Sequence, residues 1–204
     1  MKKNRISKNW LNKQRRDIYT KESKEKGYRS RSAIKLIEID NKFNIFKNAK
    51  LFLDLGAAPG GWSQVASKKI RNGKILSVDI KDMAPIKNTT FLRGNIDNID
   101  TQSEIMKFFN SKIDLIVSDM ASNTTGNKNL DSLRTGNLCL NAIEFSEKIL
   151  KPNGIFISKI FMGSTFKVIQ LKAQSVFVNV SIFKPKSSKK ESKEIYFFCK
   201  NKKF

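Results

Sequence analysis

The 204-residue sequence contains no histidine. This absence excludes histidine general bases, Ser-His-Asp triads and zinc sites with histidine ligands, so catalysis would depend on Lys, Asp, Glu, Tyr or a bound cofactor. Only two cysteines occur, Cys139 and Cys199, and they lie far apart in the chain. Neither belongs to a closely spaced metal-binding pair, so we expect two reduced thiols in a reducing compartment and no metal site.

Long apolar stretches are also missing. No segment approaches the roughly 20 apolar residues of a membrane span, and the N-terminus has no apolar core of the kind that a secretory signal needs. The basic first sixteen residues loosely resemble an organellar transit peptide, but they run directly into a motif-bearing segment. We therefore expect a cytoplasmic protein, and its charge makes a monomer the simplest expectation.

Acidic residues are scarce, because 18 Asp and Glu stand against 40 Lys and Arg, a formal net charge of +22. The field of such a surface attracts polyanions. The excess is concentrated at the ends: the net charge is +11 over residues 1–50, +3 over 51–166 and +8 over 167–204. A Lys-, Asn- and Ile-rich composition bias alone would not leave the middle nearly neutral, so the two ends are the predicted contacts for a polyanion.

Hydrophobic periodicity predicts one α/β domain over residues 31–204, and the basic residues 1–30 before it are expected to form an arm or short helices. An amphipathic helix is predicted over 32–43. Short apolar runs then alternate with amphipathic stretches, which is typical of a parallel sheet covered on both faces. The predicted strands are 50–55, 74–79, 89–93, 113–118 and 154–159, and the helices between them are 62–70, 100–109 and 134–150. Strands over 175–183 and 194–199, joined by the Lys- and Ser-rich loop 184–193, suit an antiparallel hairpin at one edge.

Residues 51–65, LFLDLGAAPGGWSQV, have the pattern of a strand, a Gly-rich turn and the start of a helix. Gly56, Ala58 and Gly61 have the spacing of a dinucleotide fingerprint, with alanine in place of the middle glycine. That glycine lets backbone approach a pyrophosphate, so a Cβ there argues against NAD and for a nucleoside without phosphates, such as S-adenosylmethionine. Asp79, at the end of the next strand, can accept hydrogen bonds from both ribose hydroxyls.

Four motifs occur in order along the chain: YRSRSAIKL at 28–36, LDLGAAPGGWSQ at 53–64, SDMASN at 118–123 and SKIFMG at 158–163. In sequence and spacing they resemble the FtsJ/RrmJ family of ribosomal RNA ribose 2′-O-methyltransferases, from about residue 10 to residue 200. The resemblance implies a Rossmann-like class I methyltransferase with a seven-stranded, mostly parallel sheet and S-adenosylmethionine as cofactor. It also implies large-subunit ribosomal RNA as substrate, methylated at a uridine in the peptidyl-transferase region of assembled particles.

The resemblance also implies which residues contact the cofactor. These are Gly60 and Trp62 in the turn, Asp79 at the ribose and Asp119 near the methionine end. An adenine-contacting aspartate is implied after the third strand, where this sequence has Asn95. Asparagine keeps one acceptor for the adenine amino group but loses the charge, which predicts preserved and weaker binding. Asp97 is the alternative acceptor, and the sequence leaves the choice open.

A catalytic set of lysine, aspartate, lysine and glutamate is implied as well. Its members match Lys35 in RSAIKL, Asp119 in SDMASN, Lys159 in SKIFMG and Glu194 in SKEIYFF. We hypothesise that Lys159 is the general base, since burial and Lys35 favour its neutral form. Asp119 and Glu194 favour the charged form, in which Lys159 would only orient the 2′-oxygen. The sequence leaves these two roles open.

RNA contacts are predicted at both basic ends. The segment 2–31 interleaves Lys and Arg with Trp10, Tyr19 and Tyr28, which suits phosphate contacts and base stacking, and the loop 184–193 adds a second cluster. Three alternatives stay open. They are a non-catalytic assembly factor of the large subunit, a methyltransferase acting on transfer RNA or an RNA cap, and, more distantly, an NAD-dependent oxidoreductase. The chain has no obvious extra cap-binding domain, and Ala58 argues against NAD.

Overall fold

The computed structural model describes residues 18–122, 128–188 and 192–203. Its centre is a seven-stranded sheet in the order β3-β2-β1-β4-β5-β7-β6. The strands are β1 (Leu51–Leu55), β2 (Lys74–Asp79), β3 (Thr90–Arg93), β4 (Ile113–Ser118), β5 (Leu150–Phe161), β6 (Phe177–Phe183) and β7 (Glu194–Lys202). The first five strands pair in parallel, whereas β7 lies antiparallel between β5 and β6. The predicted mostly parallel sheet with an antiparallel C-terminal hairpin is confirmed.

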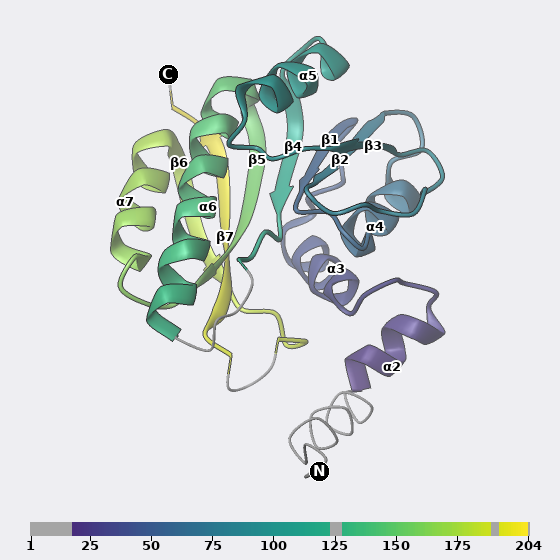
Figure 1. Cartoon of the computed structure of the whole chain (residues 1–204), viewed down its shortest axis with the longest axis horizontal. Helices are drawn as coiled ribbons and strands as arrows, with labels where there is room; N and C mark the ends of the chain where they lie inside the picture. Colours follow the sequence, from purple (N-terminus) through teal and green to yellow (C-terminus); the bar gives the residue numbers. More distant parts are fainter. Residues whose placement is uncertain (1–17, 123–127, 189–191, 204) are drawn as a thin grey trace, which may run out of the picture.

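Helices cover both faces of the sheet (Figure 1). On one face lie α3 (Ser32–Phe43) and α4 (Gly61–Lys69), and on the other lie α5 (Ile99–Phe109), α6 (Lys128–Ile149) and α7 (Phe166–Val176). The short helix α2 (Ile18–Glu25) precedes α3 and forms part of the predicted N-terminal arm. Among the described residues, no helix combines the length and apolarity that crossing a bilayer requires.

The strands are continuously apolar because helices cover both faces of the sheet. Leu53 and Leu55 of β1 point into the core beneath α5, α6 and α7, whereas Phe52 points into the core beneath α3 and α4. All three side chains are fully buried. Burial of each contributes about 1.5–3 kcal/mol, which favours apolar residues on both faces of β1, and Asp54 is the one polar residue of the strand.

The structure corrects the predicted elements near the C-terminal end. The helix α7 was not predicted, and the strand expected over 175–183 begins only at Phe177, because Ser175 and Val176 complete that helix. Helical spacing of Phe166, Ile169 and Ala173 places these side chains against the core below α6. The helix α6 begins at Lys128 instead of residue 134, and Leu150 belongs to β5.

The strand order reverses between β1 and β4. From β1 the chain moves outward through β2 to β3, and it then returns to place β4 on the other side of β1. In open α/β sheets a crevice forms at such a switch point, at the carboxyl ends of the strands. The fold therefore directs a ligand site to the turn after β1.

Candidate active site

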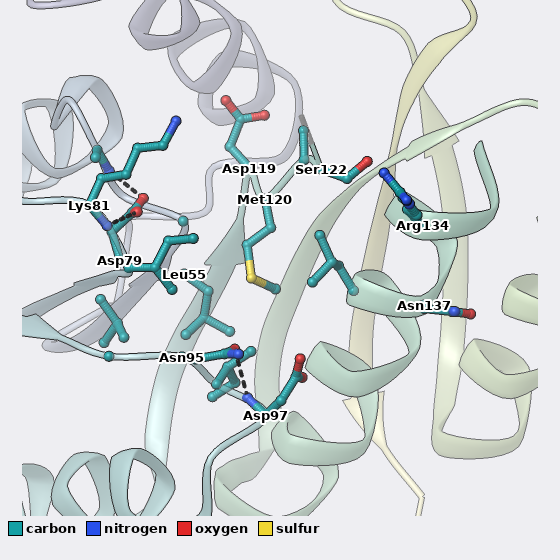
Figure 2. A pocket seen from close by; sticks show the side chains of 18 residues that line it. Leu55, Asp79, Lys81, Asn95, Asp97, Asp119, Met120, Ser122, Arg134 and Asn137 are labelled. Atoms are coloured by element: carbon teal, nitrogen blue, oxygen red, sulfur yellow. Dashed lines mark hydrogen bonds between the residues drawn. The ribbon is translucent and has the colours of Figure 1, made fainter. Parts of the chain in front are cut away.

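A cavity of about 580 Å³ opens at this switch point. One side consists of the turn after β1, the end of β2 and the loop after β3, and the other side consists of the segment after β4 and the first half of α6 (Figure 2). The lining residues that matter below are Gly56, Ala58, Asp79, Asn95, Asp97, Asp119, Met120, Arg134 and Asn137. Sequence reasoning missed the α6 residues, because only the tertiary fold brings that helix over the turn.

The turn after β1 requires glycine for steric reasons. Gly56 has φ of 76°, and a Cβ at this position would lie 2.6 Å from the side chain of Met120 and 2.9 Å from its backbone. The backbone N–H groups of Gly56 and Ala57 donate to the Val78 carbonyl at 2.9 and 3.1 Å. The turn is therefore fixed to the end of β2, where Asp79 follows.

Asp79 lies in the cavity with both carboxylate oxygens held by backbone. Its Oδ2 accepts from the N–H of Ala58 at 2.9 Å, and its Oδ1 accepts from the N–H of Lys81 at 2.8 Å. Each oxygen of an ionised carboxylate has a second acceptor site. The carboxylate is therefore rigid and still able to accept the two hydroxyls of a ribose.

Asn95 and Asp97 both line the cavity, with different hydrogen-bond partners. The side-chain oxygen of Asn95 accepts from the N–H of Asp97 at 3.0 Å (Figure 2). The Oδ1 atom of Asp97 accepts from the side-chain amide of Asn141 on α6 at 2.7 Å. Asn141 therefore orients the Asp97 carboxylate. The side-chain oxygen of Asn95, by contrast, is already occupied by a hydrogen bond within the loop after β3.

Gly60 and Trp62 lie outside the cavity lining, although the family resemblance implied cofactor contacts from both. Gly60 closes the turn with φ of 107° and donates its N–H to the Ala57 carbonyl at 2.6 Å. The Trp62 indole is buried in the core beneath α3 and donates to the Ser32 carbonyl at 2.7 Å. A cofactor contact from Trp62 would therefore have to come from its backbone.

The four residues of the predicted catalytic set form two adjacent charged pairs. Lys159 Nζ on β5 lies 2.9 Å from Asp119 Oδ1 after β4, and it also donates to the Asp119 carbonyl at 2.6 Å. Lys35 Nζ on α3 lies 2.5 Å from Glu194 Oε1 at the start of β7. The two lysine side chains are only 7% and 8% exposed, so both pairs are shielded from water.

Tyr196 links the two pairs, and sequence reasoning did not single it out. Its hydroxyl donates to Asp119 Oδ1 at 3.0 Å, and its ring centroid lies 5.8 Å from Lys35 Nζ. The signal was available in the sequence, because Tyr196 follows Glu194 by two residues and therefore shares its face of β7. In the register, Tyr196 faces Lys159.

Opposing effects act on the pKa of Asp119. Burial favours the neutral acid and is the largest single effect, but the charges of Lys159 and Lys35 and the hydrogen bonds from Lys159 and Tyr196 together outweigh it. The pKa of Asp119 is therefore below its ordinary value. Asp119 is ionised at neutral pH and faces the cavity as a carboxylate.

Arg29, in the YRSRSAIKL motif, connects the N-terminal segment to the turn after β1, which we call the cofactor turn, and to the loop after β2. Its guanidinium donates to the carbonyls of Ala84 at 2.6 Å, Pro85 at 2.7 Å and Pro59 at 3.2 Å. The backbone N–H of Arg29 also donates to the Gln64 side chain on α4 at 2.8 Å. We call this group of contacts the Arg29 anchor. It joins α2 and α3 to the turn that lines the cavity.

A polar cluster lies buried beneath the turn. Ser63 Oγ lies 2.6 Å from both Asp54 Oδ2 and Ser77 Oγ, and all three residues are fully buried. The Oδ1 atom of Asp54 has no hydrogen-bond partner among the described residues. Burial, together with the charges of Asp119 and Asp79, raises the pKa of Asp54 to about 7 although Ser63 donates to it. The described residues contain no group of His, Cys, Asp or Glu that could hold a metal ion.

Comparison with known proteins identifies the family of this chain. A family model described as FtsJ-like methyltransferase matches residues 28–202. Ribosomal RNA large subunit methyltransferase E of Pelagibacter ubique (strain HTCC1062) is 52% identical over 200 residues, which cover 98% of each chain. A crystal structure from Plasmodium falciparum, described as a ribosomal RNA methyltransferase, aligns with a TM-score of 0.76 and 37% identity over 86% of this chain and 98% of that one.

More distant structures share the fold. Human Methyltransferase-like protein 13, solved in complex with SAH, aligns with a TM-score of 0.60 and 14% identity over 82% of this chain and 79% of its own. The family match confirms the Rossmann-like fold and S-adenosylmethionine as the methyl donor, both of which the four motifs predicted. With most of its length matched by the family model and a relative 52% identical over nearly the whole chain, this protein belongs to the FtsJ-like methyltransferase family.

Proposed function

We propose that this protein methylates the 2′-hydroxyl of a ribose, that of a uridine, in the ribosomal RNA of the assembled large subunit. The observation that carries the proposal is the buried set of Lys35, Asp119, Lys159 and Glu194 beside the cofactor cavity. The name of the Pelagibacter ubique relative supports large-subunit ribosomal RNA as the substrate.

The residues of the cavity fit the polar groups of S-adenosylmethionine. Asp79 offers acceptors to the ribose hydroxyls, and the ionised Asp119 offers one to the amino group of the methionine end. When bound, this cofactor supplies an electrophilic methyl group on a sulfonium. We propose that Asp79, Asn95 or Asp97, and Asp119 hold it, with Gly60 and Trp62 contributing through their backbone.

The protein then has to position one hydroxyl and manage one proton. Alignment of two reactants can lower a barrier by about 7–11 kcal/mol, whereas a general base typically contributes about 10² to 10⁴ in rate. Positioning is the larger effect. The two charged pairs suit this task, because they hold their side chains rigidly in a site with little water.

We predict that Lys159→Ala abolishes methyl transfer and leaves the affinity for S-adenosylmethionine nearly unchanged, because Lys159 does not line the cofactor cavity. Single-turnover methylation and calorimetric titration would measure the two effects. Loss of cofactor binding in this variant would contradict the assignment. The loss is expected whether Lys159 acts as the general base or only orients the 2′-oxygen, because both roles need its amine beside Asp119.

The basic ends of the chain are the proposed RNA contacts. Residues 1–30 form the proposed RNA-binding arm, of which the structure describes residues 18–30, including Tyr19 and Tyr28. Trp10 and the central part of the loop 184–193 lie outside the described residues. Lys184 and Lys186 are exposed on the described part of that loop, where their charges can meet phosphate.

The decisive experiment transfers radiolabelled methyl from S-adenosylmethionine to undermethylated large ribosomal subunits and maps the product by resistance to alkaline cleavage. Label at one alkali-resistant linkage, at a uridine, is the expected result. Label only on transfer RNA or capped RNA would support ribose 2′-O-methylation and refute ribosomal RNA as the substrate. No label on any RNA would favour a non-catalytic assembly factor.

A further inference from the structure

The loop between β6 and β7 is docked on the helix that carries Lys35. Lys35 and Glu38 are three residues apart on α3 and therefore share one face of the helix. Lys35 contacts Glu194 at the start of β7, and Glu38 contacts the loop that leads into β7. One helix face thus holds both the catalytic carboxylate and the segment that precedes it.

Glu38 holds this loop by its backbone. One carboxylate oxygen accepts from the N–H of Lys186 at 2.5 Å, and the other accepts from the N–H of Ser187 at 2.9 Å. Hydrogen bonds from backbone N–H to an ionised carboxylate are roughly twice as strong as neutral ones. The loop residues that follow are correspondingly well fixed, and Ser187 and Ser188 are only 2% and 6% exposed.

Ser188 then contacts the catalytic set directly. Its hydroxyl donates to Glu194 Oε1 at 2.9 Å, and this oxygen also accepts from Lys35 Nζ. Glu194 is therefore held by one charged and one neutral donor from two different elements. The hydroxyl of the neighbouring Ser187 is buried as well, but within the described part of the chain it has no hydrogen-bond partner.

We propose that the side chains of Glu38 and Ser188 form a loop clip that positions Glu194 beside Lys35 for the methyl-transfer reaction. Both are positioning residues, since they act through Glu194 and not on the reactants. The inference rests on the proposed function. It assigns a role to Glu38 and to Ser188, which neither the cofactor cavity nor the RNA surface requires.

The first test compares Ser188→Ala with Ser187→Ala, two removals of a buried hydroxyl one residue apart. We expect Ser188→Ala to lower kcat for subunit methylation about 10-fold, the effect of removing one hydrogen bond to a charged group. The KM for S-adenosylmethionine should not change, because Ser188 lies outside the cofactor cavity. Ser187→Ala keeps its backbone N–H and should retain wild-type kcat, and both variants should unfold at similar temperatures.

The second test needs no activity. Glu38→Gln replaces one acceptor oxygen with a donor, so the N–H groups of Lys186 and Ser187 should exchange with deuterium faster than in the wild type. Glu104→Gln, an exposed position on α5, serves as the matched control and should not alter exchange in the loop. The Glu38 variant should also show a lower kcat with an unchanged KM for the cofactor.

The outcomes separate the two proposals. If the wild type methylates subunits and Ser188→Ala retains its kcat, or if both serine variants lose activity equally, the loop clip is refuted and the proposed function stands. If the wild type does not methylate subunits, the proposed function fails. Hydrogen exchange then tests whether Glu38 holds the loop. Unchanged exchange of the Lys186 and Ser187 N–H groups in Glu38→Gln would refute the loop clip without any measurement of activity.

Discussion

Asp54 is an acidic side chain in a place where ionisation is unfavourable. Its carboxyl group lies between β1 and α4 with one oxygen bonded to Ser63 and no described partner for the other. A buried polar atom without a partner costs more as a charge than as a neutral acid. The raised pKa therefore means that the folded protein binds a proton at Asp54 more tightly than the unfolded chain does.

We predict a pH-dependent stability difference between the wild type and Asp54→Asn. Because the pKa of Asp54 is raised from 3.8 to about 7, the wild type loses stability as the pH rises from about 4 to about 7, whereas asparagine does not titrate. The free energy of unfolding of the variant relative to the wild type should rise over this range by up to about 4 kcal/mol. Urea unfolding at pH 4, 5, 6, 7 and 8 measures it. Asp100→Asn, at an exposed position, is the control, and parallel curves for wild type and Asp54→Asn would show that Asp54 does not titrate in this range.

We predict that Asp97 contributes more than Asn95 to the affinity for S-adenosylmethionine, as the acceptor for the adenine amino group. Asn141 orients the Asp97 carboxylate, which leaves its other oxygen as an acceptor for the adenine amino group. Asp97→Asn should therefore weaken S-adenosylmethionine binding about 10-fold or more, as expected when a hydrogen bond to a charged group is removed. Asp100→Asn again provides the control in a calorimetric titration. Equal affinity of Asp97→Asn and wild type, with a loss in Asn95→Ala, would make Asn95 the adenine contact.

The sequence predicted the charged residues of the site better than their partners. The motif resemblance selected Lys35, Asp119, Lys159 and Glu194, and the structure brings these four side chains together in two adjacent pairs. The motif resemblance was insufficient for the contacts of Arg29 and Glu38, whose partners are backbone groups distant in the chain. Backbone acceptors and donors carry no side-chain signature, so only a three-dimensional structure reveals them.

At the scale of elements, the Arg29 anchor attaches the first helices to the cofactor turn. A guanidinium can bond several carbonyl groups at once because its donors are arranged in a fixed planar fork. The Pro59 carbonyl lies in the turn itself, whereas those of Ala84 and Pro85 belong to the loop after β2. The anchor thus joins the turn after β1 to the loop after β2, on the side of the cavity that Asp79 lines.

We predict that Arg29→Ala weakens S-adenosylmethionine binding about 5-fold, which corresponds to about 1 kcal/mol. Arg29→Lys should give an intermediate result, because one ammonium cannot reach all three carbonyls. Arg71→Ala removes an exposed arginine from the loop between α4 and β2 and should have no effect on the cofactor. If Arg71→Ala weakened binding as much, net charge and not the anchor would explain the loss.

The predicted helices and strands were accurate where a single hydrophobic period, helical or alternating, covered a segment. They were wrong where a helix runs directly into a strand. The strands before residue 120 are short apolar runs between polar loops, and all were located to within one residue. In the segment 166–183, α7 passes into β6 without an intervening loop. With no turn residues between them, the end of α7 was predicted as strand.

At the scale of the whole molecule, the charge distribution predicts how RNA binding depends on salt. Residues 1–17 carry seven Lys and Arg and one Asp and precede the described helix α2. Removing them should weaken RNA binding and reduce the slope of log K against log salt by about 0.7–0.9 for each phosphate that these residues neutralise. Filter binding over a range of KCl concentrations measures the slope, and cofactor titration should be unchanged. Parallel slopes for the truncated and full chains would place the phosphate contacts elsewhere.

The position of β7 between β5 and β6 constrains the order in which the sheet can assemble. The strand β6 is made before β7, yet its only neighbour in the described sheet is β7. Until β7 arrives, β6 has no hydrogen-bonded place in the sheet, and β5 has an open edge. The pairing of β5 with β7 spans α7 and β6 in the chain, and such a non-local pairing closes slowly because chain entropy is lost before the stabilising interactions form. We therefore expect Glu194, the first residue of β7, to reach Lys35 in the same late step that completes the sheet.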